Sequence, residues 1–149
     1  MVVLDASSLS AGWQPGPDSR VVTPLRVWRE MEELGVPPFE VGIAEPSAAS
    51  IDSVRSASKG TGDDVRLSNA DVDLLALASD LGALLISEDY SVQNVAEVLS
   101  ICWTSVGKPI TEVRKWRYRC KGCLKVFDER HDDCPVCGSE LRSYGGRRR

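Results

Sequence analysis

Three aspartates stand at the ends of predicted secondary-structure elements, where their carboxylates can meet. Asp5 follows the apolar run Met1–Leu4, and Asp89 comes soon after the apolar run Ala83–Ile86. Both runs have the composition of buried strands. Asp71 falls in the first turn of a predicted helix, on the side that also carries leucines and should pack on the sheet. Asp73 falls on another side of this helix, which we expect to face water. Because ligands of open α/β sheets bind outside the carboxyl ends of the strands, we expect the other three aspartates to form part of a metal site there.

Glu30 is the fourth candidate ligand. It borders the apolar stripe of a helix that we expect to end at Leu34, and it comes within reach of the other acids if that helix packs on the same sheet. Taken alone, Glu30 also suits the solvated flank of a helix. Asp71 has a second interpretation too, as the partner of Ser68 in a capping box. The metal hypothesis therefore depends on the convergence of all four acids.

Four carboxylates gathered in one cleft repel one another unless a divalent cation joins them. Oxygen-only ligand sets suit Mg²⁺ or Mn²⁺, and such ions activate water and hold a phosphodiester for hydrolysis. In-line attack by water would leave a 5′-phosphate and a 3′-hydroxyl. His131 is the single histidine of the sequence, which argues against a Ser-His-Asp triad. Neither a GxGxxG nor a Walker motif occurs, so we expect no nucleotide cofactor.

The second set of candidate ligands consists of sulfur atoms. Cys120 and Cys123 form one CxxC pair, and Cys134 and Cys137 form another, with ten residues between the pairs. This spacing predicts a tetrahedral Cys₄ zinc site, closed and structural, in which the metal supplies the folding free energy of a module too small for its own core. Disulfides are the alternative, and a cytoplasmic chain disfavours them. We expect Cys102, in a strand-like run, to be a buried apolar residue.

Strand-like and helix-like runs alternate over the first 106 residues, which predicts an α/β fold in three layers around a mostly parallel sheet. The expected helices include one that Thr23 caps, one over Ser47–Lys59, the central helix after Ser68 and one over Ser91–Leu99. We divide the chain into a domain over residues 1–106, a basic linker over 107–116, a zinc ribbon over 117–144 and a basic tail over 145–149.

Charge is distributed unevenly along the chain, although the net charge is only −4. Residues 1–107 contain 6 Lys and Arg against 16 Asp and Glu, whereas residues 108–149 contain 12 against 6. An acidic first part suits cations, and a basic second part suits a polyanion such as nucleic acid. No run approaches the roughly 20 apolar residues of a membrane span, and the N-terminus lacks the basic region of a secretory signal. We therefore expect a cytoplasmic protein that does not bind membranes.

A basic run interleaved with aromatic residues crosses the predicted linker and continues beyond it. Basic groups can neutralise phosphates, while the rings of Trp116 and Tyr118 can stack on unpaired bases. The same two rings could instead pack the two domains together. The candidate RNA-binding residues are Arg114, Lys115, Trp116, Arg117, Tyr118, Arg119, Lys121 and Lys125.

Several segments, taken in order, resemble the motifs of the PIN-domain ribonucleases. These segments are VVLDASSL at the start, VWRE ending at Glu30, LSNADVDLLALA from Leu67 and SEDY from Ser87. The TGD before the central helix, the longer match SEDYSVQNVA and the Cys₄ module resemble one branch of them, the archaeal Nob-type endonucleases. That branch matures the 3′ end of small-subunit ribosomal RNA. The resemblance extends from Val2 to about Leu141.

The resemblance implies that Asp5, Glu30, Asp71 and Asp89 bind Mn²⁺ or Mg²⁺ in a three-layer PIN-like domain. It also implies cleavage of single-stranded precursor rRNA on a pre-ribosomal particle.

Two positions depart from the family pattern. Ser87 stands where the family usually has Thr, which preserves the hydroxyl, and Glu88 replaces the usual Asp beside Asp89, so we expect Glu88 to be secondary. Two alternatives stay open. One is a VapC-type toxin, a PIN nuclease that normally lacks a zinc ribbon. The other is a non-catalytic RNA-binding assembly factor.

Overall fold

The first part of the chain folds around a five-stranded sheet whose neighbouring strands are all parallel. The computed structural model describes residues 1–148, with side chains described for residues 1–145. The strand order is β3-β2-β1-β4-β5. The strands are β1 (Val2–Leu4), β2 (Val21–Thr23), β3 (Gly42–Ile43), β4 (Leu84–Ile86) and β5 (Trp103–Thr104). The predicted α/β class with a mostly parallel sheet is confirmed.

The order of the strands reverses beside β1. From β1 the chain moves to β2 and β3 on one side, and later to β4 and β5 on the other. Such a reversal leaves a crevice at the carboxyl ends of the two central strands. The pairing of β1 with β4 places Leu4 opposite Ile86, so the residues that follow them, Asp5 and Ser87, lie next to each other.

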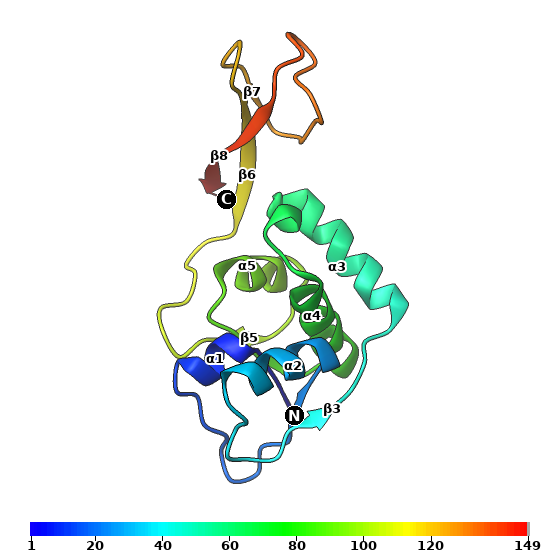
Figure 1. The fold of residues 1–149 in the computed structure, drawn as a ribbon, viewed down its shortest axis with the longest axis vertical. Helices are drawn as coiled ribbons and strands as arrows, with labels where there is room; N and C mark the ends of the chain where they lie inside the picture. Colours follow the sequence, from blue (N-terminus) through cyan, green and yellow to red (C-terminus); the bar gives the residue numbers. More distant parts are fainter. Residues whose placement is uncertain (149) are drawn as a thin grey trace.

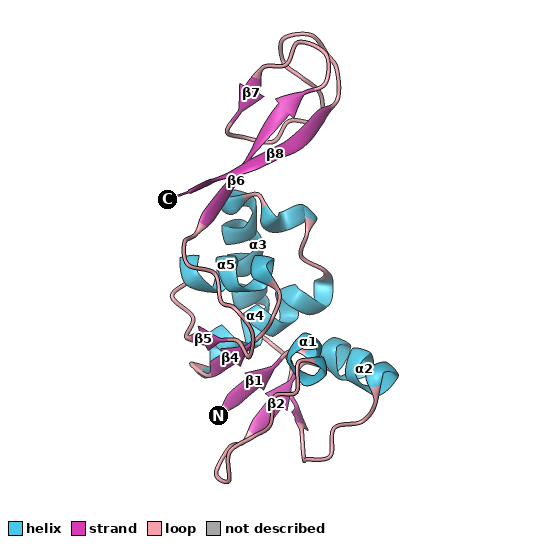
Figure 2. Ribbon diagram, turned by 90° about the vertical axis from the view of Figure 1, so that its left-hand side faces the viewer, coloured by secondary structure: helices cyan, strands magenta, loops and turns pink. Residues whose placement is uncertain are grey.

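Helices connect these strands and cover the sheet. They are α1 (Ala6–Ser10), α2 (Leu25–Leu34), α3 (Ala48–Thr61), the 3₁₀ turn η1 (Asp63–Val65), α4 (Asn69–Leu81) and α5 (Tyr90–Val98). In Figure 2, α3, α4 and α5 are grouped above the sheet, while α1 and α2 pack side by side next to it. The domain therefore has the layered arrangement that the alternating sequence pattern predicts.

Two of the predicted helix starts are confirmed and one is wrong. Ser47 caps α3, and Ser68 forms a capping box with Asp71 at the start of α4. Thr23 does not cap α2, because it is the last residue of β2. Its hydroxyl donates a 2.9 Å hydrogen bond to the carbonyl of Leu4 instead. Thr23 thus joins the side chains that fix the central strands to each other.

Two burial predictions also fail, for different reasons. We expected Asp73 to face water, but α2 packs on that side of α4, and Asp73 is 3% exposed with its Oδ2 atom 2.5 Å from Arg26. The pattern of one helix does not reveal a second helix packed on its polar side. Cys102 is exposed, because it precedes β5 at the edge of the sheet.

The last part of the chain forms an antiparallel ribbon that rises away from the first domain (Figure 1). Its strands are β6 (Arg114–Cys120), β7 (Val126–Phe127) and β8 (Leu141–Arg148), in the order β7-β6-β8. The backbone of residues 145–148, which we assigned to a tail, is the end of β8, and Arg149 lies outside the described residues. Among the helices of residues 1–148, none combines the length and apolar composition needed to cross a membrane.

Candidate active site and metal centres

Asp5 is held at the carboxyl end of β1 by two serine hydroxyls. Its side chain is buried, and its Oδ2 atom accepts hydrogen bonds from Ser7 Oγ and Ser87 Oγ, both 2.6 Å long. Its backbone N–H donates to the carbonyl of Ile86 at 3.0 Å. The Oδ1 atom has no hydrogen-bond partner among the described residues. Asp5 therefore presents one oriented oxygen atom to the crevice between β1 and β4.

Asp71 and Asp89 each use one carboxylate oxygen at the start of a helix. Asp71 Oδ2 accepts a 2.7 Å hydrogen bond from the N–H of Ser68. Asp89 Oδ1 accepts hydrogen bonds from the N–H groups of Ser91 and Val92, at 2.7 and 3.2 Å. Within the described part of the chain, the second oxygen of each carboxylate has no such partner. Helix capping and metal binding are thus compatible, because they use different oxygen atoms.

Neighbouring carboxylates affect the pKa values of two of the predicted acids, Glu30 and Asp71. Burial, and then the charges of Asp71 and Asp5, raise the pKa of Glu30 above its ordinary value. Burial also raises the pKa of Asp71 against the hydrogen bonds of the helix cap, which lower it, and the charges of Asp5 and Asp89 add to the increase. The fold therefore places Asp71 within electrostatic range of three other acids. Asp5 comes from a strand end, Glu30 from the body of a helix and Asp89 from the start of another.

The acids form a looser group than the cysteines. Of the residues that the structure describes, only the cysteines bring three or more ligand atoms all within 4.8 Å of one another. A wider spacing suits Mg²⁺, which keeps several of its waters and binds proteins through one or two carboxylates. The carboxylates of Asp5, Asp71 and Asp89 are each oriented by hydrogen bonds to one oxygen, and Asp89 is exposed, which fits such a hydrated divalent ion.

Ser87 connects two of the acids. Its side chain is 1% exposed, and its hydroxyl donates to Asp5 while accepting a 3.2 Å hydrogen bond from the N–H of Asp89. The Ser7 hydroxyl likewise donates to Asp5, and it accepts a 3.1 Å hydrogen bond from the backbone N–H of Glu88. The two hydroxyls thereby hold the turn after β4 against Asp5. Both contacts of Ser87 are made by its hydroxyl, which a threonine at position 87 would also provide.

Glu88 points away from the other acids. Its carboxylate accepts hydrogen bonds from the backbone N–H groups of Val106 and Gly107, at 2.6 and 2.9 Å. It therefore anchors the start of the connection between the domains.

The sulfur atoms of the four cysteines come together in the ribbon. Cys120 Sγ lies 3.4 Å from Cys137 Sγ, and Cys123 Sγ lies 3.7 Å from Cys134 Sγ. A tetrahedral site with Zn–S bonds of about 2.3 Å would hold its sulfur atoms about 3.8 Å apart, so the spacing fits zinc. Hydrogen bonds from Ser139 lower the pKa of Cys137 to about 6, which favours the thiolate form that binds metal.

Each CxxC pair forms the same kind of tight turn. The N–H groups of Gly122 and Val136 donate to the sulfur atoms of the first cysteine of each pair, at 3.3 and 3.4 Å. The residue after each second cysteine has a positive φ, 63° at Leu124 and 74° at Gly138. The described cysteines form no disulfide. Backbone donors to sulfur and paired turns are the surroundings that a structural zinc site requires.

The two aromatic residues of β6 face the first domain. Trp116 Nε1 donates a 3.0 Å hydrogen bond to Asp63, and the guanidinium of Arg66 lies 3.7 Å from the centre of the indole ring. Tyr118 is 5% exposed, and a Cβ atom on Gly62 would come within 2.7 Å of its hydroxyl. Both rings thus pack the two domains together, which is the second of the two roles that the sequence allowed for them.

Asp63 is a buried residue that sequence reasoning missed. It is 1% exposed, and its Oδ2 atom accepts hydrogen bonds from Thr61 Oγ1 at 2.7 Å and Asn94 Nδ2 at 2.6 Å. Asn94 also bonds to both the N–H and the C=O of Arg114, at 2.7 and 2.8 Å. One carboxylate and one amide thereby fix β6 to α3 and α5. A local pattern does not reveal this role, because the partners lie 31 and 53 residues away.

Most of the remaining candidate RNA-binding residues lie on the ribbon. Strand pairing places Arg117 opposite Tyr144 and Arg119 opposite Arg142, so these side chains share one face of the sheet. The guanidinium of Arg119 lies 5.3 Å from the centre of the Tyr144 ring. Sequence reasoning missed the contribution of β8, because the register of strands that lie far apart in the chain is not readable from the sequence.

The two candidate lysines beyond β6 are exposed. Lys121 pairs with Glu140 at 2.5 Å, and Lys125 has no ion-pair partner among the described residues.

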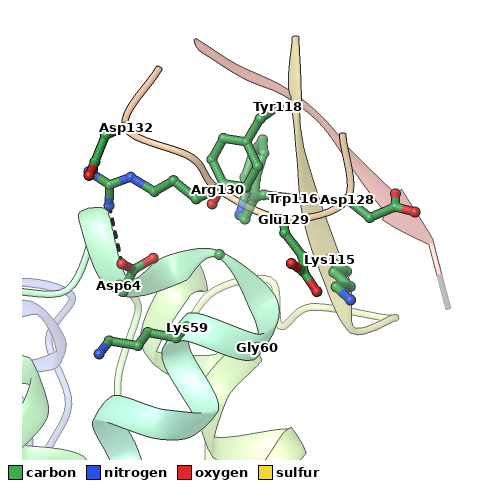
Figure 3. Close-up of a pocket in the computed structure, with 11 residues that line it drawn as sticks. Lys59, Gly60, Asp64, Lys115, Trp116, Tyr118, Asp128, Glu129, Arg130 and Asp132 are labelled. Carbon is green, nitrogen blue, oxygen red and sulfur yellow. Dashed lines mark hydrogen bonds and ion pairs between the residues drawn. The ribbon is translucent and has the colours of Figure 1, made fainter. Parts of the chain in front are cut away.

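A cavity of about 620 Å³ lies at the junction, between the end of α3 and the ribbon (Figure 3). Arg130 reaches Asp64 at 3.2 Å on one side of it, and Lys115 lies on the other. Its wall also carries Asp128 and Glu129, and none of the four acids of the crevice lines it. Because its charges are mixed and already partly paired, this cavity does not define a ligand.

The parallel sheet and its switch point fit the class to which comparisons with known proteins assign the chain, the PIN-domain ribonucleases. Residues 17–81 match the family model described as "PIN domain of ribonuclease". The chain is 39% identical over 112 residues to Endoribonuclease Nob1 of Pyrococcus abyssi, a match that covers 74% of this chain and 70% of the relative. It is 32% identical over 153 residues to Endoribonuclease Nob1 of Methanothermobacter thermautotrophicus, covering 93% of this chain and 90% of the relative. The chain therefore belongs to the Nob1 family of endoribonucleases, and the predicted family is confirmed.

The wider PIN group is represented as well. Ribonuclease VapC1 of Thermoplasma acidophilum is 36% identical over 110 residues, and the match covers 73% of this chain but only 57% of that relative. The Methanothermobacter relative, by contrast, matches over a length that includes the ribbon. The prediction of an endoribonuclease enzyme is confirmed by this family membership.

Proposed function

We propose that this chain is a metal-dependent endoribonuclease that cuts single-stranded RNA at the 3′ end of precursor small-subunit rRNA. The observation that carries the proposal is the set of acids at the switch point, where Asp5, Asp71 and Asp89 each have one oxygen held by hydrogen bonds and one without a partner among the described residues. Membership of the Nob1 family supports the choice of RNA as the substrate.

Asp5, Glu30, Asp71 and Asp89 would hold Mn²⁺ or Mg²⁺. When bound, the ion supplies water activation and neutralises charge on the phosphodiester. Ser7 and Ser87 keep Asp5 turned toward the crevice, and the helix caps do the same for the other two aspartates. No side chain of the site is placed to act as a covalent nucleophile with a histidine base, because His131 lies on the ribbon against Phe127. The residues thus serve hydrolysis by water.

Cys120, Cys123, Cys134 and Cys137 would hold a structural Zn²⁺, and the ribbon they stabilise would bind RNA. We propose phosphate contacts for Arg114, Lys115, Arg117, Arg119, Lys121 and Lys125. Trp116 and Tyr118 act mainly at the domain junction, since both are packed there. The place of action would be a pre-ribosomal particle in the cytoplasm.

The test is cleavage of an RNA that spans the 3′ end of small-subunit rRNA, with and without Mn²⁺. The wild-type chain is compared with Asp5→Asn, Asp89→Asn and the control Asp52→Asn, an exposed acid of α3 outside the crevice. We expect one metal-dependent cut, retained by the control and lost in both crevice variants.

Other outcomes divide the proposal into parts. Cuts scattered over any unpaired RNA would keep the nuclease and remove the rRNA substrate, as for a VapC-type enzyme. Tight binding without cleavage, unchanged in both variants, would make the chain an RNA-binding assembly factor.

A further inference from the structure

The connection between the domains forms one wall of a groove beside the crevice. This groove has a volume of about 470 Å³ and is lined by residues of α5 and of the segment that leads from Lys108 into β6. Figure 1 shows the course of these two segments. Tyr90, the residue directly after Asp89, lines it, together with Pro109 and Arg114. Its volume is within the range of small-ligand sites, which are about 300–1,000 Å³.

Within the described part of the chain, the exposed side chain of Tyr90 makes no polar contact that would stabilise the fold. Its side chain is 60% exposed, and it has no hydrogen-bond or ring partner among the described residues. The cap of α5 is made by Asp89 with the N–H groups of Ser91 and Val92, so the Tyr90 ring takes no part in it. An exposed ring next to a metal-site acid is a surface on which an unpaired base can stack.

Two cationic side chains line the groove. The side chains of Lys108 and Arg114 are exposed and form no ion pair with any described residue, although the backbone of Arg114 is fixed by Asn94. The two acids on the wall, Glu112 and Asp63, balance them in formal charge, but Asp63 is buried and directs its carboxylate to Thr61, Asn94 and Trp116. A flat ring, two cations and apolar Pro109 together match one base with its phosphate.

We propose that this groove binds the unpaired RNA nucleotide next to the scissile phosphate, with its base on Tyr90 and its phosphate near Lys108 and Arg114. The groove would thus lead the strand from the crevice toward β6 and the basic ribbon. The proposal rests on the proposed endoribonuclease function, and it adds a binding site to that function.

The test uses an RNA oligonucleotide centred on the bond that the wild-type chain cuts, trimmed one nucleotide at a time from each end. We compare kcat/KM for the wild type, Tyr90→Ala and Tyr90→Phe. Removal of the nucleotide that occupies the groove should lower wild-type kcat/KM at least about fivefold, the low end of what stacking of one base contributes. Tyr90→Ala should show that loss on the untrimmed RNA and no further loss on trimming, whereas Tyr90→Phe should behave as the wild type.

The control is Leu81→Ala, which removes an exposed apolar side chain at the end of α4, outside both the groove and the ribbon. It should keep the dependence on the trimmed nucleotide. Lys108→Gln should lower the slope of log KM against log salt concentration by about 0.7, the effect of one phosphate contact to a single strand. If Tyr90→Ala still responds to trimming as the wild type does, the groove proposal is overturned.

Binding measured by fluorescence anisotropy without divalent metal separates this proposal from the proposed function. A wild-type chain that binds the oligonucleotide through Tyr90 but never cuts it would keep the groove and remove the nuclease. If the wild-type chain cuts the RNA and Tyr90→Ala binds and cleaves it equally well, the proposed nuclease function stands and the proposed groove site is contradicted.

Discussion

The two candidate metal centres of this chain are assembled in opposite ways. The four sulfur atoms lie within 4.8 Å of one another and come from two short turns of one small ribbon. The four carboxylates come from β1, α2 and the starts of α4 and α5, which are distant in sequence and brought together by the sheet. We therefore expect the ribbon to need its metal in order to fold, and the core beneath the crevice to form without any metal. A closed sulfur site stabilises, and an open oxygen site is left free to react.

Removal of zinc should have the largest effect. We expect a strong chelator, or Cys134→Ser, to unfold the ribbon, because about 10–16 kcal/mol of metal-binding free energy is also its folding free energy. The first domain should keep its helices, since its core contains no ribbon residue. Circular dichroism should show retained helix signal, while NMR spectra lose the dispersed signals of the ribbon. The control is Cys102→Ser, which changes the cysteine outside the cluster and should change neither. A ribbon that stays folded without metal contradicts the comparison.

The junction should show the next largest effect. Asp63→Ala would leave the buried donors of Asn94 and Trp116 without their acceptor, and we expect a loss of about 2–4 kcal/mol in the free energy of unfolding, measured with urea. Asp64→Ala is the matched control, because Asp64, the next residue along the chain, makes only a surface ion pair with Arg130, worth about 0–1 kcal/mol. Equal losses in the two variants would show that the junction is not held by Asp63.

Position 87 tests how the crevice is oriented. Ser87→Ala removes the hydroxyl that joins Asp5 to the N–H of Asp89, and we expect roughly a tenfold fall in kcat/KM, the usual effect of losing a partner of a metal ligand. Ser87→Thr keeps the hydroxyl and should stay near wild-type activity, with a small loss where the added methyl group crowds the buried site. Full activity in Ser87→Ala would mean that Asp5 needs no such support.

The smallest effect should be a pH dependence of stability in the metal-free protein. The pKa values of Asp71 and Glu30 are raised in the folded state, so these groups stabilise it fully below their ordinary values near pH 4 and lose that contribution as pH rises through the raised values. Asp71→Asn should therefore gain stability relative to the wild type between about pH 4 and pH 7. Added Mn²⁺ should reverse the order at pH 7. Thermal denaturation at each pH measures the difference, and a difference that does not change with pH would contradict the mutual repulsion.

The sequence was informative where the physics is local. The CxxC spacing predicts the sulfur cluster, because each pair needs only its own turn. The spacing of Ser68 and Asp71 indicates a capping box. The apolar runs before Asp5 and Asp89 predict two strands, and these strands pair side by side in the parallel sheet. Those features alone were enough to predict the fold class, and they are the basis of the prediction that three of the four acids lie at one edge.

What the sequence did not show depends on contacts between distant segments. Asp73 looks solvent-facing on its own helix and is buried only because α2 packs there. Asp63 has partners on α5 and β6, and Tyr144 joins the basic face of the ribbon through a strand register that no local pattern encodes. Trp116 fits both RNA stacking and domain packing by composition, and its contacts with Asp63 and Arg66 in the folded chain favour packing.

The most direct test of this account is anomalous X-ray scattering from crystals grown with Mn²⁺, recorded at the zinc and manganese absorption edges. We predict a zinc peak between Cys120, Cys123, Cys134 and Cys137, and a manganese peak in the crevice of Asp5, Glu30, Asp71 and Asp89. Manganese bound elsewhere, or no metal among the sulfur atoms, would contradict the assignment of one structural and one catalytic centre.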